Sequence, residues 1–188
     1  MNKGQEQKTV VFKLALLGDK GVGKRALREL YFGYRKDFGE EENNLLKFSI
    51  KRVKVDGREI VFQVWEFNSG DEYEALREIH YRGVRAAILV FDVTNPSTYQ
   101  NLPFWLEELW KKAGKVPLII CGNKKNQRAG KERKDITVPE HGKVYCNKIK
   151  EKTGIEIQYI ETDEDTGENL EEAFQFLAKA TLKSIDFF

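Results

Sequence analysis

The chain has 188 residues, a length that suits one domain with a hydrophobic core of its own. Its 32 Lys and Arg residues nearly balance its 30 Asp and Glu residues, so the formal net charge of +2 gives no reason to expect a nucleic-acid partner. No apolar run reaches the roughly 18 residues that would predict a membrane span, and residues 1–8 lack the apolar core of a signal peptide.

The cysteines and histidines form no recognisable site. Cys121 and Cys146 lie in unlike contexts without metal or redox spacing, so we predict reduced core thiols and a cytoplasmic protein. His80 and His141 have no companions at ligand spacing, and we expect no metal site from them. Residues 183–188 contain no cysteine for prenylation, so we expect no lipid anchor in this chain.

Short apolar segments alternate along the chain with longer segments that have helical spacing. The predicted strands cover residues 10–17, 48–55, 59–67, 86–93, 117–121 and 156–160. The predicted helices cover residues 24–34, 72–81, 99–112, 140–151 and 170–182. This alternation predicts an α/β domain with a six-stranded, mostly parallel sheet and helices on both faces.

The pair Asp56-Gly57 lies between two predicted strands and indicates a tight hairpin, hence one antiparallel edge strand. We place the domain at residues 9–184, with a flexible tail at residues 1–8 and a short one at residues 185–188.

The first predicted strand runs into the sequence GDKGVGK, residues 18–24, which opens directly into a helix. Such a loop wraps a phosphate group with backbone N–H groups, while the helix N-terminus and a Lys ammonium add positive potential. The candidate phosphate-binding residues are Gly18, Gly21, Val22, Gly23 and Lys24.

The last position of this motif should carry a Ser or Thr hydroxyl for Mg²⁺, but here it is Arg25. A guanidinium cannot ligate a cation. Either Arg25 points away and the metal lacks a ligand, or Arg25 takes the place of the metal and neutralises phosphate directly; both alternatives remain open, and neither predicts bound magnesium.

Several further segments resemble the Ras superfamily of small GTPases, and its Rab branch in particular. They are Val64-Trp65, Tyr81-Arg82-Gly83, Phe91-Asp92-Val93-Thr94-Asn95, Gly122-Asn123-Lys124 and Thr166-Gly167-Glu168-Asn169. The resemblance covers nearly the whole chain and implies a P-loop NTPase G domain.

The resemblance also identifies substituted positions. Without a gap, the switch Thr becomes Asn43, the metal-linked Asp becomes Glu66, and the Gly that senses the γ-phosphate becomes Ser69. The Gln that orients the attacking water becomes Gly70, or Asp71 if the register slips by one residue, and neither can do its work.

Two more substitutions lie near the expected nucleotide. Lys20 would crowd an incoming arginine finger, and Asp163-Glu164-Asp165 stands where the family has Ser-Ala-Lys, which places carboxylates near a nucleotide.

The guanine-binding motif Asn-Lys-x-Asp is also altered. Asn123 and Lys124 match, but Asn126 replaces the Asp, and an amide loses one contact to guanine at a cost of about 2–4 kcal/mol. This amide would suit xanthine better.

These substitutions together predict a monomeric pseudo-GTPase, a Rab-like interaction protein with absent or very weak GTP hydrolysis, that binds proteins through the former switch regions. The candidate contact residues are Tyr31, Phe32, Tyr34, Phe38, Trp65, Phe67, Tyr73 and Tyr81, about half of which we expect in the core. The alternative is a slow, magnesium-independent switch that binds GTP, GDP or a xanthine nucleotide weakly. An active GTPase with relocated groups is the third reading, with Glu72 as the only carboxylate at hand.

Overall fold

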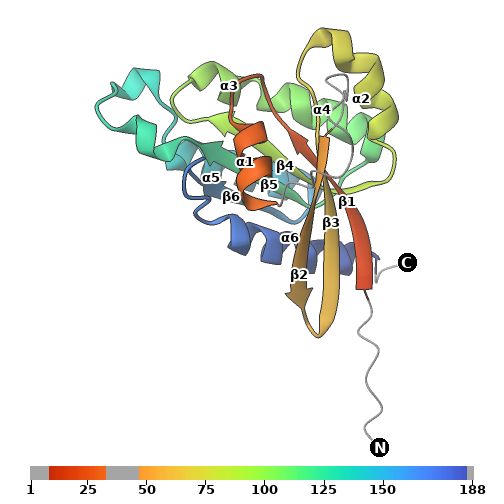
Figure 1. Cartoon of the computed structure of the whole chain (residues 1–188). Coiled ribbons are helices and arrows are strands. Elements are labelled where there is room, and N and C mark those ends of the chain that lie inside the picture. The colour runs from red at the N-terminus through yellow and green to blue at the C-terminus, as the bar shows by residue number, and fades with distance from the viewer. Residues whose placement is uncertain (1–8, 33–46, 186–188) are drawn as a thin grey trace, which may run out of the picture.

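The computed structural model describes residues 9–32 and 47–185, which form one six-stranded sheet with helices on both faces (Figure 1). The strands are β1 (Thr9–Leu17), β2 (Lys47–Val55), β3 (Arg58–Glu66), β4 (Val84–Asp92), β5 (Leu118–Asn123) and β6 (Ile157–Glu161). The α-helices are α1 (Lys24–Tyr31), α2 (Glu74–His80), α3 (Pro96–Gln100), α4 (Leu102–Ala113), α5 (Pro139–Thr153) and α6 (Leu170–Ile185). Short 3-10 turns cover η1 (Asp71–Tyr73), η2 (Lys125–Arg128) and η3 (Arg133–Asp135).

The strand order is β2-β3-β1-β4-β5-β6, in which only β2 runs antiparallel to its neighbour. The predicted fold class is therefore confirmed. At the hairpin, Asp56 and Gly57 have φ angles of 49° and 75°, the left-handed conformations that a two-residue turn between twisted strands requires. This turn lies at the bottom of Figure 1.

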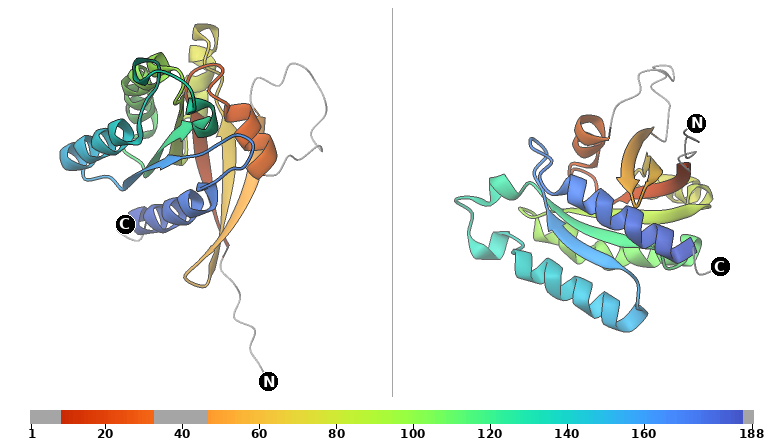
Figure 2. Two further views of the ribbon diagram at one scale, coloured as in Figure 1. Left: turned by 90° about the vertical axis from the view of Figure 1, so that its left-hand side faces the viewer. Right: turned by 90° about the horizontal axis from the view of Figure 1, so that it is seen from below.

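Helices cover both faces of the sheet (Figure 2), and an apolar layer on each face holds them to the strands. On one face, Leu27 of α1 and Phe174 of α6 pack against Phe62 and other strand residues. On the other face, Trp105 of α4 and Cys146 of α5 join a second cluster. The strands between these layers are apolar on both sides, as the sequence of parallel strands usually is.

The predicted helix over residues 99–112 is wrong in one respect, because the structure divides it into α3 and α4 at Asn101. Pro103 occupies the first turn of α4, where its missing N–H is tolerated, but its ring would clash with the carbonyl of residue 99 in a continuous helix. The first predicted helix ends as α1 at Tyr31; residues 33 and 34 lie outside the described residues.

The predicted tails lie outside the described residues, except for Ile185, which ends α6. Both cysteines are buried and unpaired, in agreement with core thiols. Within the part of the chain that the structure describes, no helix is both long and apolar enough to cross a membrane.

Candidate nucleotide site and switch face

The parallel strands end at one edge of the sheet, where an α/β fold places its ligand. The loop of residues 18–23 follows β1 at this edge, and Gly23 caps α1. Gly18 has a φ of 134°, and a Cβ atom there would lie 2.1 Å from the Val90 carbonyl oxygen. Only glycine fits this position, so the loop owes its close approach to β4 to a missing side chain.

Lys24 folds back over the loop that precedes it. Its Nζ donates to the Gly18 carbonyl at 2.6 Å and to the Asp19 carbonyl at 2.7 Å, and the residue is 7% exposed. Burial lowers the pKa of Lys24 to about 8, although the carboxylates of Glu66 and Asp19 oppose this shift. The Lys24 ammonium, the predicted phosphate-binding cation, therefore lies within the loop and is held by two of its carbonyl groups.

Two side chains of the β5 end fasten the same loop. Asn123 donates from Nδ2 to the Val22 carbonyl at 2.9 Å, while its buried Oδ1 has no partner among the described residues. Lys124 donates from Nζ to the Gly21 carbonyl at 2.7 Å and to Asp92 at 2.8 Å. The structure thus brings Asn123 and Lys124 to the phosphate loop, whereas the sequence motif assigns them to guanine, a role that stays a prediction.

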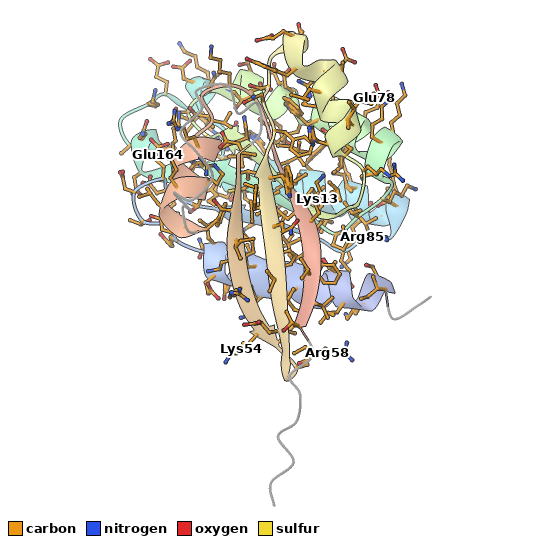
Figure 3. The ribbon with its side chains drawn as sticks, turned by 45° about the vertical axis from the view of Figure 1, so that its right-hand side comes forward. Lys13, Lys54, Arg58, Glu78, Arg85 and Glu164 are labelled. Carbon is orange, nitrogen blue, oxygen red and sulfur yellow. The ribbon has the colours of Figure 1, made fainter. Side chains whose placement is uncertain are left out.

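The acidic stretch 163–165 lies beside Asn126 and the phosphate loop. Asp163 is 1% exposed and accepts backbone N–H bonds from Asn126 at 3.2 Å and from Asp165 at 3.0 Å. Glu164 reaches across to α1, where its Oε2 lies 2.8 Å from the place that a Cβ on Gly23 would take (Figure 3). A carboxylate thus stands beside the phosphate loop, while the side chain of Asn126 is exposed.

Four charged side chains form a row of ion pairs between α1 and the end of β3: Arg25, Glu29, Arg28 and Glu66. Arg25 donates from Nε to Glu29 at 2.9 Å, with a side chain that is 69% exposed. Arg28 is 1% exposed and donates to Glu29 at 3.1 Å and to Glu66 at 2.8 Å. Its remaining nitrogen lies 3.4 Å from the Ser49 hydroxyl.

A pocket of about 410 Å³ opens between the phosphate loop and these charges. Residues with charged or hydroxyl side chains that line it are Lys20, Lys24, Arg25, Glu29, Glu66 and Ser69. The pocket is therefore lined both by cations, from the loop and from α1, and by two carboxylates, Glu29 and Glu66, that already have cationic partners.

Comparisons with known proteins identify the family to which this domain belongs. The model of the Ras family matches residues 13–183. The chain belongs to the Ras family. It is 31% identical over 179 residues to the Ras-related protein Rab-4A of Mus musculus, covering 94% of this chain and 77% of that protein. It is also 29% identical over 185 residues to the Ras-related protein Rab-7a of Paramecium octaurelia, covering 93% and 82% of the two chains.

A Ras-family domain implies a magnesium ion beside the phosphates, and the donor set of this chain does not fit one. At the position of the hydroxyl ligand, Arg25 has no acceptor atom and is directed along α1 to Glu29. At the position of the metal-linked carboxylate, Glu66 is already neutralised by Arg28. Asn43, which the alignment pairs with the switch Thr, lies outside the described residues.

Sequence reasoning does not find Arg28 or Asp19 as members of this site. Arg28 stands in an amphipathic segment where a basic residue ordinarily faces water, and only its burial reveals its role. Asp19 accepts bonds from Trp105 at 2.7 Å and Asn101 at 2.8 Å, contacts that join the phosphate loop to α4. No local pattern signals a contact between residues so far apart in the chain.

The switch-region aromatic residues divide between the core and the surface, as expected. Phe32, Phe67 and Tyr81 are buried in the core, and Tyr34 and Phe38 lie outside the described residues. Trp65 is partly exposed and stacks against Phe48, with ring centroids 5.1 Å apart.

The other side of this aromatic group comes from α2 and β1. His80 stacks on Trp65 with ring centroids 5.9 Å apart, and the Lys13 ammonium lies 4.6 Å from the Trp65 ring centroid. Burial, followed by the charge of Lys13, lowers the pKa of His80. We call Phe48, Trp65, His80 and Lys13 the switch face; Figure 3 shows Lys13 on β1.

Proposed function

We propose that this chain is a Rab-like regulatory protein that acts by binding other proteins and hydrolyses GTP either not at all or very slowly. The observation that carries this proposal is the buried ion pair between Arg28 and Glu66. Glu66 stands where the family has its metal-linked carboxylate, and its charge is balanced from within the protein.

Electrostatics explains why this pair opposes catalysis. A divalent cation beside Glu66 would meet the positively charged guanidinium of Arg28 and be repelled by it. Mg²⁺ supplies several kcal/mol of stabilisation to the charge that develops during phosphoryl transfer. Hydrolysis also requires a side chain that orients the attacking water. Gly70 or Asp71 stands where the family has the Gln that does this, and neither can replace it.

The switch face supports a role in protein binding. Partly exposed aromatic rings with a neighbouring cation are typical of the anchor residues of protein interfaces. Trp65, Phe48 and His80 form such a group across β2, β3 and α2. The two buried free cysteines fit a reducing compartment, so we place this activity in the cytoplasm.

Hydrolysis is tested by single-turnover assays with radiolabelled GTP on the full chain, with and without Mg²⁺. We expect no phosphate release above the buffer blank. The triple variant Arg25→Ser, Arg28→Leu, Glu66→Asp should gain magnesium-dependent GTP binding, because it restores a hydroxyl and frees the carboxylate. Steady GTP turnover by the unmodified chain would contradict the proposal.

Partner binding is tested by quantitative co-purification with wild type, Trp65→Ser and Phe104→Ser. Phe104 is 53% exposed on α4, is not part of the switch face, and serves as the control for loss of an exposed aromatic side chain. Proteins that bind wild type and Phe104→Ser but not Trp65→Ser would support the role. Identical sets of bound proteins from all three chains would argue against it.

One observation favours the second candidate, a magnesium-independent nucleotide switch. The phosphate loop keeps its glycine at position 18, and Lys24, Asn123 and Lys124 make the contacts that order this loop. Denatured protein should then release a stoichiometric guanine or xanthine nucleotide on chromatography, and calorimetric titration of GDP, GTP and XTP should show no magnesium dependence. If no nucleotide is released and none of the three nucleotides binds in the titrations, the switch is excluded.

A further inference from the structure

The segment that follows β3, residues 67–81, is anchored in the core by Phe67 and Tyr81, and a buried cation between them adds polar contacts. Arg77 lies on α2 and is 2% exposed. Its Nε and Nη2 donate to the two carboxylate oxygens of Glu108 on α4, at 2.8 and 3.0 Å. This is a bidentate pair, the most directional contact that a guanidinium makes.

The same guanidinium also holds the backbone of the preceding loop. Nη1 of Arg77 donates to the Gly70 carbonyl at 2.7 Å and to the Asn68 carbonyl at 3.1 Å. The amide of Tyr73 in turn donates to the Gly70 carbonyl at 3.0 Å, which closes the turn before α2. Loop, helix α2 and helix α4 therefore meet at one cation.

This cluster reaches the phosphate loop through α4. The guanidinium carbon of Arg77 lies 5.1 Å from the ring centroid of Trp105, and the indole of Trp105 donates to Asp19. Tyr81 completes the cluster by donating from its hydroxyl to Glu108 at 2.8 Å. Residues 67–81 and the phosphate loop are thus braced against the same face of α4 by contacts within the protein.

The arrangement bears on the switch face because His80 lies three residues after Arg77 on α2. Residues three apart lie on the same side of a helix, so the contacts that hold Arg77 also fix the orientation of His80, which stacks on Trp65. If the loop moved away, the buried guanidinium would lose two of its acceptors, and if α2 moved away, Glu108 would keep a 13% exposed carboxylate without its cation; proteins avoid both arrangements.

We propose that Arg77 is the positioning residue that holds residues 67–81 in one arrangement, so that the switch face is presented whether or not a phosphate group occupies the loop. The guanidinium of Arg77 then fixes the backbone at Asn68 and Gly70 by hydrogen bonds, so that no bound ligand is needed to order it. The consequence for partner binding rests on the proposed function, but the fixed arrangement itself does not.

Hydrogen exchange measured by mass spectrometry tests the proposal on the full chain. In wild type, exchange of the amides of residues 68–73 should change less than twofold on addition of GDP, GTPγS with Mg²⁺, or pyrophosphate. In Arg77→Met, the same amides should exchange at least tenfold faster, while those of β4 (Val84–Asp92) keep their rates. Arg77→Lys, which keeps the charge but cannot bridge all four acceptors, should give intermediate rates.

Two control variants separate the clamp from general loss of stability. Arg85→Met removes an exposed guanidinium from β4 (Figure 3), and Tyr81→Phe removes the other donor to Glu108 while leaving Arg77 in place. Both should keep the wild-type exchange of residues 68–73.

Unchanged exchange in Arg77→Met would overturn the proposal, and so would ligand-induced slowing of these amides in wild type. The wild-type comparison decides the question even if Arg77→Met does not fold. GTP hydrolysis by the unmodified chain would contradict the proposed function, but the hydrogen-exchange result would still test the role of Arg77.

Discussion

The Nε atom of Arg28 lies 2.8 Å from Oε2 of Glu66, and this ion pair joins α1 to the end of β3 beside the phosphate loop. The guanidinium is 1% exposed and the carboxylate 15%, so water screens the pair little. The stability of the domain and the proposed lack of magnesium binding thus depend on the same two side chains.

The first prediction concerns the stability that this pair provides. Arg28→Met should lower the free energy of unfolding by about 3 kcal/mol, since it leaves a poorly hydrated carboxylate without its partner. Arg52→Met, which breaks the exposed pair with Glu59, is the matched control and should cost less than about 1 kcal/mol. Urea denaturation measures both losses of unfolding free energy. Equal losses for the two variants would show that burial does not make the Arg28 pair more stabilising than the exposed pair.

The second prediction concerns the base. Asn126→Asp restores a carboxylate that accepts two hydrogen bonds from guanine, and should raise GDP affinity by about 2 kcal/mol, roughly 30-fold, relative to XDP. Gln127→Glu adds the same charge one position further along η2 and should leave the ratio unchanged. Calorimetric titrations of both nucleotides measure it, and a ratio that Asn126→Asp does not alter would mean that this residue does not face a base.

The third prediction concerns Glu164, whose carboxylate stands beside Gly23 at the phosphate loop. Glu164→Gln removes a negative charge near the place where a phosphate would bind, and should raise pyrophosphate or GDP affinity about fivefold, or about 1 kcal/mol. Glu172→Gln, at an exposed position on α6, is the control. Equal affinities for the Glu164 and Glu172 variants would place Glu164 outside the field of the ligand.

The fourth prediction concerns pH. Burial lowers the pKa of Lys24 to about 8 from its ordinary value of 10.5, so between these values the unfolded chain keeps a proton that the folded chain has lost. The contribution of Lys24 to the free energy of unfolding should therefore rise with pH across this window, by up to about 3 kcal/mol.

Denaturation of wild type and Lys24→Met from pH 7.5 to 10.5 isolates this effect, because tyrosines and cysteines titrate in both chains. The stability of wild type relative to the variant should increase with pH. Two parallel curves would show that the folded chain keeps Lys24 protonated throughout.

Much of the fold follows from local pattern. The alternation of strands and helices, the hairpin at Asp56-Gly57 and the glycine-rich loop after β1 are each specified by a few adjacent residues. Period and turn geometry are properties of neighbouring side chains, so a single sequence displays them. The division of α3 from α4 also has a local cause in Pro103, although the helical spacing on both sides conceals it.

The residues of the chain alone identify the positions that depart from the family pattern: Arg25 in place of a hydroxyl, Asn126 in place of a guanine-binding carboxylate, and Gly70 or Asp71 in place of a water-orienting amide. Which distant side chains pair with one another became apparent only in the folded domain. Arg28 meets Glu66, Arg77 meets Glu108, and Asp19 meets Trp105 across 38, 31 and 86 residues of chain. Charge interactions depend on distance and burial in space, and neither is visible until the strands are paired and the helices packed.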